Sequence, residues 1–173
     1  MMTLEQAIQT ALDFENRVRV VYQEAVARAV DPTAKRMLEV MVAEEQRHVE
    51  YLESRLAEWK QTGKVSAAAL GTDIPSAKRI QEGVNQLKDR MQLPENQRRE
   101  AIDTLKRAIA VEDETSTFYE KMVNELPAGE QQQMFQRFLE IESGHAAIVQ
   151  AELDSVQGNG FWFDVREFGL EGA

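Results

Sequence analysis

The chain has 173 residues, of which 43% are hydrophobic, enough to bury one core of ordinary size. Its formal net charge of −10 argues against nucleic acid and anionic membranes as partners. The absence of cysteine excludes disulfides, thiolate metal sites and iron–sulfur clusters. We expect neither a membrane span nor a signal peptide, because no apolar run is long enough and the N-terminus lacks a basic segment followed by an apolar one. The expected location is the cytoplasm.

The first part of the chain predicts a helical hairpin over residues 4–61. Helix-favouring residues are abundant and there are only 9 glycines and 4 prolines. Apolar residues at helical spacing predict one helix over residues 4–30 and a second over 33–61. Asp31-Pro32 separates them, and proline suits the first turn of the following helix. A connection this short makes the two helices antiparallel.

The second part of the chain predicts another hairpin over residues 95–156. Its helices are expected at 95–126 and 130–156, separated by the sequence "PAG". The two hairpins are joined by residues 62–94, which are too many for a structureless loop inside a domain. Apolar spacing there predicts a short helix over 76–91.

These elements predict an all-α fold, a four-helix bundle of two antiparallel hairpins joined by a long crossover that contains a short helix. The whole chain, residues 1–173, is expected to form a single domain. The tail at 157–173 is rich in aromatic residues and has no helical pattern. We expect it to cover the bundle or to form a subunit contact.

Both predicted hairpins carry the same set of acidic and imidazole side chains. In each, a glutamate is followed thirty residues later by a Glu-x-x-His motif, and the second set repeats the first with a shift of 97 residues. These residues are Glu15, Glu45 and His48 in the first hairpin, and Glu112, Glu142 and His145 in the second. The two histidines are the only ones in the chain.

The spacing places all six groups at one level of the bundle. In an antiparallel hairpin, residues equidistant from the turn lie at the same height, and Glu15 and His48 are centred on Asp31-Pro32. Residues three apart lie on the same helix face, so within each Glu-x-x-His motif the glutamate and the histidine are neighbours. Four carboxylates and two imidazoles would balance two divalent ions. Mixed oxygen and nitrogen ligands suit iron or manganese, with zinc as another occupant.

Two further groups of residues accompany this set. Tyr22 and Tyr119 each follow a glutamate of the set by seven residues, on the same helix face. They either donate a hydrogen bond to ligand carboxylates or lie within electron-transfer range of the site, or else they are core tyrosines whose hydroxyls find partners elsewhere. Glu44, Glu114 and Glu140 neighbour the set in sequence but lie off the apolar stripe, so we expect them to be solvated.

The six-residue pattern resembles the ferritin-like di-iron carboxylate proteins, and most closely a rubrerythrin-like domain. The resemblance covers residues from about 4 to 156. It implies two iron ions, with Glu45 and Glu142 bridging them and one histidine on each. Glu15 and Glu112 would then be terminal ligands. It also implies a homodimer or larger homo-oligomer.

The chain departs from that family pattern in two ways. Without cysteine it lacks the rubredoxin module of full-length rubrerythrins, so electrons must come from an external donor. Thr115 stands where those proteins have a further metal-binding glutamate. The resemblance implies an oxidoreductase that reduces O2 or peroxide. The alternatives are a ferroxidase coupled to iron storage and a non-catalytic metal-binding bundle.

Overall fold

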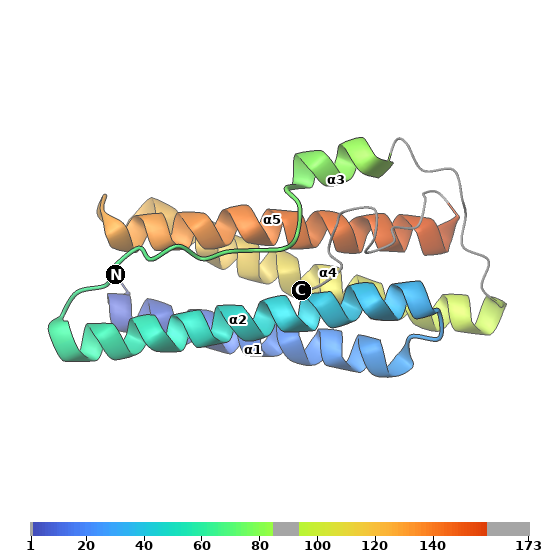
Figure 1. Cartoon of the computed structure of the whole chain (residues 1–173), viewed down its shortest axis with the longest axis horizontal. Helices are drawn as coiled ribbons and strands as arrows, with labels where there is room; N and C mark the ends of the chain where they lie inside the picture. The colour runs from blue at the N-terminus through green and yellow to red at the C-terminus, as the bar shows by residue number, and fades with distance from the viewer. Residues whose placement is uncertain (1, 85–93, 159–173) are drawn as a thin grey trace.

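Within residues 2–84 and 94–158, which the computed structural model describes, the chain forms four long helices and one short helix (Figure 1). α1 packs against α2, α4 packs against α5, α1 also packs against α4, and the short α3 lies on α5. This arrangement confirms the predicted all-α bundle of two hairpins joined by a long crossover. In chain order the helices are α1 (Leu4–Arg28), α2 (Pro32–Thr62), α3 (Ala77–Val84), α4 (Glu95–Glu125) and α5 (Glu130–Gln157).

The helix ends follow from local side-chain chemistry. At the start of α1, the Thr3 hydroxyl accepts the backbone N–H of Gln6 at 3.2 Å, and the Gln6 side chain accepts the backbone N–H of Thr3 at 3.0 Å. At the start of α2, the Asp31 carboxylate accepts two backbone N–H groups at 2.8 and 2.9 Å. α2 ends at Thr62 and is capped by Gly63, whose φ of 68° lies in the left-handed region that glycine favours.

The crossover between the hairpins is bound along the side of the bundle. The Tyr51 hydroxyl of α2 donates to the Ala68 carbonyl at 2.9 Å, and the Arg137 side chain of α5 donates to the Leu70 carbonyl at 3.0 Å. Ile74 is buried against the core. The predicted helix at 76–91 is present as α3. The remainder of that prediction and nearly all of the predicted tail lie outside the described residues.

The buried apolar side chains form two clusters, one on each side of a polar layer. One cluster lies toward the α1–α2 turn and the other toward the opposite end of the bundle. Representative members are Val18, Met41, Leu105 and Ile148 in the first, and Ile8, Leu52, Phe118 and Phe135 in the second. The layer between the two clusters is therefore where the structure departs from an ordinary apolar core.

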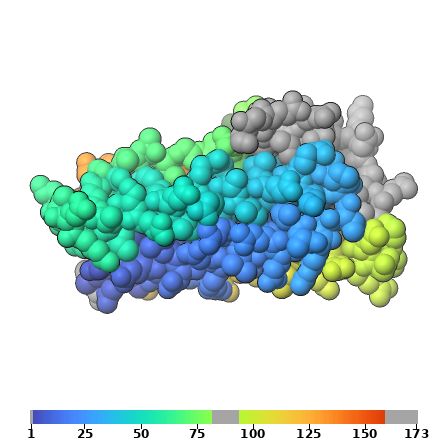
Figure 2. Space-filling model, turned by 60° about the horizontal axis from the view of Figure 1, so that its bottom comes forward, coloured from blue at the N-terminus to red at the C-terminus, as the bar shows by residue number. Residues whose placement is uncertain are grey.

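The outer surface of the α1–α2 hairpin is seen in Figure 2, where the two helices lie side by side along the length of the molecule. Among the described residues, no helix combines the length and apolar character needed to cross a membrane.

One buried carboxyl group lies away from that layer. Glu152 is 3% exposed, and neither of its carboxyl oxygens has a hydrogen-bond partner. It lines a cavity of about 60 Å³ at the α1–α2 turn, whose other charged lining residues are Arg28, Asp31 and Glu100. Burial, and then the charge of Asp31, raises the pKa of Glu152 well above its ordinary value.

This raised pKa predicts how Glu152→Gln changes the pH dependence of stability. Above about pH 4.3 the unfolded chain releases this proton while the folded protein keeps it, so stability falls as pH rises. The substitution removes that effect. The variant should therefore gain stability relative to the wild type from pH 5 upward, by up to about 1.4 kcal/mol per pH unit. Urea unfolding at pH 5, 6 and 7 measures this, with Glu140→Gln in parallel, and a pH-independent difference would contradict it.

Gly144 provides a second prediction, because the crossover lies directly against it. A Cβ at this position would lie 2.9 Å from the Pro75 carbonyl oxygen, which is backbone. Alanine is preferred to glycine in a helix by about 1 kcal/mol. Gly144→Ala should nevertheless destabilise the fold by about 1–3 kcal/mol, because the crossover must shift. Thermal unfolding tests this against Gly71→Ala, where a Cβ has open space. A more stable Gly144→Ala variant would show that the contact does not matter.

Candidate metal centre

The polar layer between the two apolar clusters contains all six residues that the sequence predicts as ligands. The four long helices each contribute, and every one of the six side chains is fully buried. They are Glu15 from α1, Glu45 and His48 from α2, Glu112 from α4, and Glu142 and His145 from α5. Within α2 and within α5, the three-residue spacing places the carboxylate and the imidazole on one inward face.

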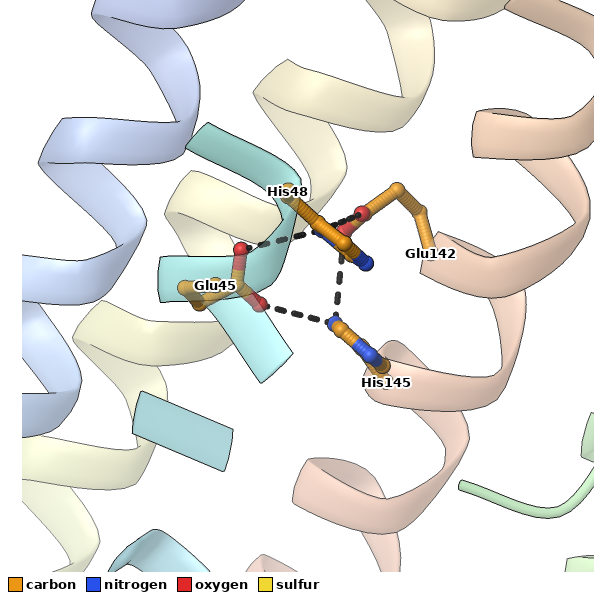
Figure 3. Close-up of side chains that lie close together, drawn as sticks. All are labelled: Glu45, His48, Glu142 and His145. Carbon is orange, nitrogen blue, oxygen red and sulfur yellow. Dashed lines mark ion pairs between the residues drawn. The ribbon is translucent and has the colours of Figure 1, made fainter. Parts of the chain in front are cut away.

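The two histidines lie at the centre of the layer with their rings parallel. The ring centroids are 5.3 Å apart and the planes differ by 4°. In Figure 3, Glu45 and Glu142 lie on opposite sides of this pair, and both are joined to the imidazoles by ion pairs. The Nδ1 atom of each ring is the one that faces the carboxylates.

Glu45 and Glu142 each reach both imidazoles. The Glu45 carboxylate oxygens lie 2.8 Å from His145 Nδ1 and 3.4 Å from His48 Nδ1. The Glu142 oxygens lie 3.3 Å from His48 Nδ1 and 3.6 Å from His145 Nδ1. Each of these two carboxylates therefore lies close to the Nδ1 atoms of both imidazoles.

Glu15 and Glu112 each approach one imidazole in this layer. The Glu15 carboxylate is 3.0 Å from His48 Nδ1, and the Glu112 carboxylate is 4.0 Å from His145 Nδ1. These two glutamates come from the neighbouring helices α1 and α4, which pack against each other. The layer therefore has two central carboxylates and two outer ones.

The donor atoms fit a metal ion. One ligand atom from each of Glu45, His48, Glu142 and His145 can be chosen so that all four lie within 4.8 Å of one another. Both oxygens of Glu45 and of Glu142, and Nδ1 of His145, have no partner in hydrogen-bond geometry although all are buried. Unpartnered buried polar atoms are costly, and these oxygen and nitrogen atoms lie close to one another. This set of oxygen and nitrogen atoms could hold a metal ion.

Burial and the closely spaced carboxylates shift the pKa values of groups in this layer. Burial, then the charges of Glu142 and Glu45, raises the pKa of Glu112 well above its ordinary value. Burial lowers the pKa of His48, but the charge of Glu15 and the close carboxylates of Glu142 and Glu45 outweigh this effect, so the pKa is raised well above its ordinary value. In both cases the protonated form of the group is favoured.

The structure shows the partners of the two tyrosine hydroxyls. The Tyr22 hydroxyl donates to Glu112 Oε1, and the Tyr119 hydroxyl donates to Glu15 Oε1. Each tyrosine thus contacts the outer glutamate of the other hairpin. Burial, followed by the charge of the carboxylate it contacts, raises the pKa of each hydroxyl well above its ordinary value. Both therefore remain protonated and act as donors.

The expectation that Glu44 is solvated is wrong. Glu44 is fully buried, and its Oε1 accepts the Asp73 backbone N–H at 2.9 Å and a hydrogen bond from the Arg47 guanidinium. Burial raises its pKa, but the nearby His145 imidazole and the hydrogen bond from the Asp73 amide outweigh this and lower the pKa to about 2. The sequence signal is its spacing: Glu44 lies four residues before His48, on the same side of the helix. Glu114 and Glu140 are exposed, as expected.

Thr115 is also fully buried near the layer. Its hydroxyl donates to the Val111 carbonyl at 2.8 Å, one turn earlier in α4. The position where the resemblance expects another carboxylate therefore holds a hydroxyl that is bonded to its own helix.

The family of the chain follows from a comparison with protein-family models. A model described as "Ferritin-like domain" matches residues 5–155, which include both hairpins and all six residues of the layer. The chain belongs to the ferritin-like family. Searches of curated proteins and of solved structures found no significant match to this ferritin-like chain.

The tyrosine contacts predict a stability difference. Tyr22→Phe or Tyr119→Phe leaves a carboxylate of the polar layer without its hydrogen-bond donor. Each substitution should lower the free energy of unfolding by about 1–3 kcal/mol. Tyr51→Phe is the matched control, because its hydroxyl donates to a carbonyl at an exposed position. Denaturant unfolding compares the three variants. Equal losses in all three would mean that the layer does not depend on these donors.

Proposed function

We propose that this ferritin-like chain is a non-haem di-iron protein of rubrerythrin type that reduces O2 or peroxide. One observation supports it most strongly: four carboxylates and two imidazoles lie fully buried in one layer, with Glu45 and Glu142 each within 3.6 Å of both Nδ1 atoms. We take the whole chain, residues 1–173, as one such domain.

Each residue of the layer would have a distinct role toward two metal ions. Glu45 and Glu142 would bridge the ions, because each contacts both imidazoles. His48 and His145 would bind one ion each through Nδ1. Glu15 and Glu112 would each bind one ion from outside, because each approaches one imidazole.

The charge and the chemistry of the ligands favour iron or manganese. Four carboxylates and two neutral imidazoles balance two divalent cations, and this oxygen-rich set with nitrogen suits iron and manganese, with zinc as another occupant. Two iron ions would supply the electrons for a two-electron reduction of O2 or peroxide.

The protein itself would control protons and water around the ions. The hydroxyls of Tyr22 and Tyr119 each hold a proton directed at an outer carboxylate. All six ligand side chains are buried, which limits the competing water around them. Phe138 packs edge-on against the His48 ring with centroids 5.3 Å apart, and so closes that side with an apolar surface.

The electrons would come from outside the chain, from Fe(II) or from a separate electron-transfer protein. The chain has no cysteine and therefore no thiolate-bound iron of its own. We propose a homodimer or larger homo-oligomer, as the resemblance implies.

A non-catalytic metal-binding role is the second candidate, and Thr115 favours it. Its hydroxyl is bonded to the Val111 carbonyl, so it does not replace the missing carboxylate.

Rapid mixing of Fe(II)-loaded protein with H2O2, and separately with O2, tests the function. Oxidation of both ions within one turnover, repeated when a reductant is added, supports the oxidoreductase. Fe(II) that binds but is oxidised no faster than free Fe(II) would reject it in favour of the metal-binding role. Molecular mass in solution shows whether the particle is a cage suited to iron storage.

The difference between central and outer glutamates gives a further prediction. Glu45→Ala removes a carboxylate that would contact both ions, so the variant should bind at most one equivalent of metal. Glu15→Ala should retain two equivalents, with one bound more weakly. Titration with Zn²⁺ or Co²⁺, followed by calorimetry, measures both. The same stoichiometry and affinity in the two variants would show that the roles are wrongly assigned.

A further inference from the structure

Behind the two imidazoles, on the side away from the ligand carboxylates, three buried atoms lie close together without hydrogen-bond partners. They are Glu44 Oε2, His48 Nε2 and His145 Nε2. Glu44 Oε2 is 3.8 Å from His145 Nε2 and 4.0 Å from His48 Nε2. All three side chains are fully buried. A single carboxylate oxygen therefore faces the outer nitrogen of both rings.

The other oxygen of Glu44 is already engaged. Oε1 accepts the Asp73 backbone N–H at 2.9 Å and a hydrogen bond from Arg47, and Arg47 is also paired with the Asp73 carboxylate at 2.6 Å. These contacts fix the rotation of the carboxylate. Oε2 is thereby left facing the imidazoles.

We propose that Glu44 is a positioning residue that accepts the Nε2–H of both histidines, directly or through one water. A neutral imidazole carries one proton, and a proton held at Nε2 leaves Nδ1 free to bind metal. The separations of 3.8 and 4.0 Å exceed a direct hydrogen bond, so the contact requires either a small shift of the side chains or one bridging water. This inference rests on the proposed metal centre, and it identifies Glu44 as a residue that increases the affinity of that centre for metal.

One carboxylate can serve both rings because the rings are parallel, with planes that differ by 4°. The second hairpin has no counterpart to Glu44, because the residue with the same spacing from His145 is Ile141. Glu44 is therefore the acidic residue that faces the Nε2 side of both rings within the described residues.

Two substitutions distinguish this positioning role from a purely structural one, in which Glu44 only anchors the crossover. In Glu44→Gln the Arg47 and Asp73 donors would hold the amide oxygen at the Oε1 position. The amide NH2 would then face both Nε2 atoms, donate to them and favour the proton on Nδ1, where it competes with metal. Glu44→Ala removes the acceptor without adding a donor.

The experiment measures Zn²⁺ affinity in the wild type, Glu44→Gln and Glu44→Ala, with Glu140→Gln as the exposed control. If Glu44 positions the rings, Glu44→Gln should bind Zn²⁺ about 10–100-fold more weakly than the wild type, and at least as weakly as Glu44→Ala. If Glu44 only anchors the crossover, Glu44→Gln should resemble the wild type and Glu44→Ala should be the weaker binder. That order would overturn the proposal.

Nitrogen NMR of the zinc-loaded wild type provides a readout that needs no variant to fold. With only two histidines in the chain, four ring nitrogens report the tautomers directly. Protons on both Nε2 atoms support the proposal, and a proton on either Nδ1 overturns it. Neither measurement involves turnover. If the protein failed to reduce O2 or peroxide, the proposed function would be rejected, but the role of Glu44 in metal binding would still stand.

Discussion

The structure depends on the burial of four carboxylates and two imidazoles in one layer of the bundle. An isolated buried charge is prohibitively unfavourable unless it is paired, protonated or bound to metal. In this structure the pKa values of Glu112 and of both histidines are raised, tyrosine hydroxyls donate to the outer carboxylates, and carboxylate oxygens without hydrogen-bond partners lie close to one another. The apolar core is divided in two because this layer crosses the whole bundle.

The layer has an approximate twofold symmetry that follows from the repeat of 97 residues. It accounts for the reciprocal tyrosine contacts, since Tyr22 and Tyr119 occupy equivalent positions on neighbouring helices. The symmetry fails where the crossover passes. Glu44 and Arg47 of the first hairpin bind Asp73, whereas Ile141 and Gly144 occupy the equivalent positions of the second. There the missing side chain of Gly144 lets the Pro75 backbone approach α5.

Most of the fold could be predicted from the sequence because it depends on local signals. Apolar spacing and the Asp31-Pro32 boundary predicted the helices to within about two residues at most ends, and the repeated spacing predicted which six side chains share a level. The role of those six as ligands stays a prediction.

Glu44 and Glu152 were missed for a different reason. Their burial depends on elements distant in sequence: the crossover covers Glu44, and the α1–α2 turn lies against Glu152. A pattern within one helix cannot show what another segment places over its flank. The contact that explains Gly144 is of the same kind.

Anomalous X-ray diffraction from metal-loaded crystals tests the central claim most directly. If the layer binds two ions, two peaks about 3.5–4 Å apart should appear, one beside His48 Nδ1 and one beside His145 Nδ1, with Glu45 and Glu142 in contact with both. A single peak, or a pair of ions bridged instead by Glu15 or Glu112, would contradict it.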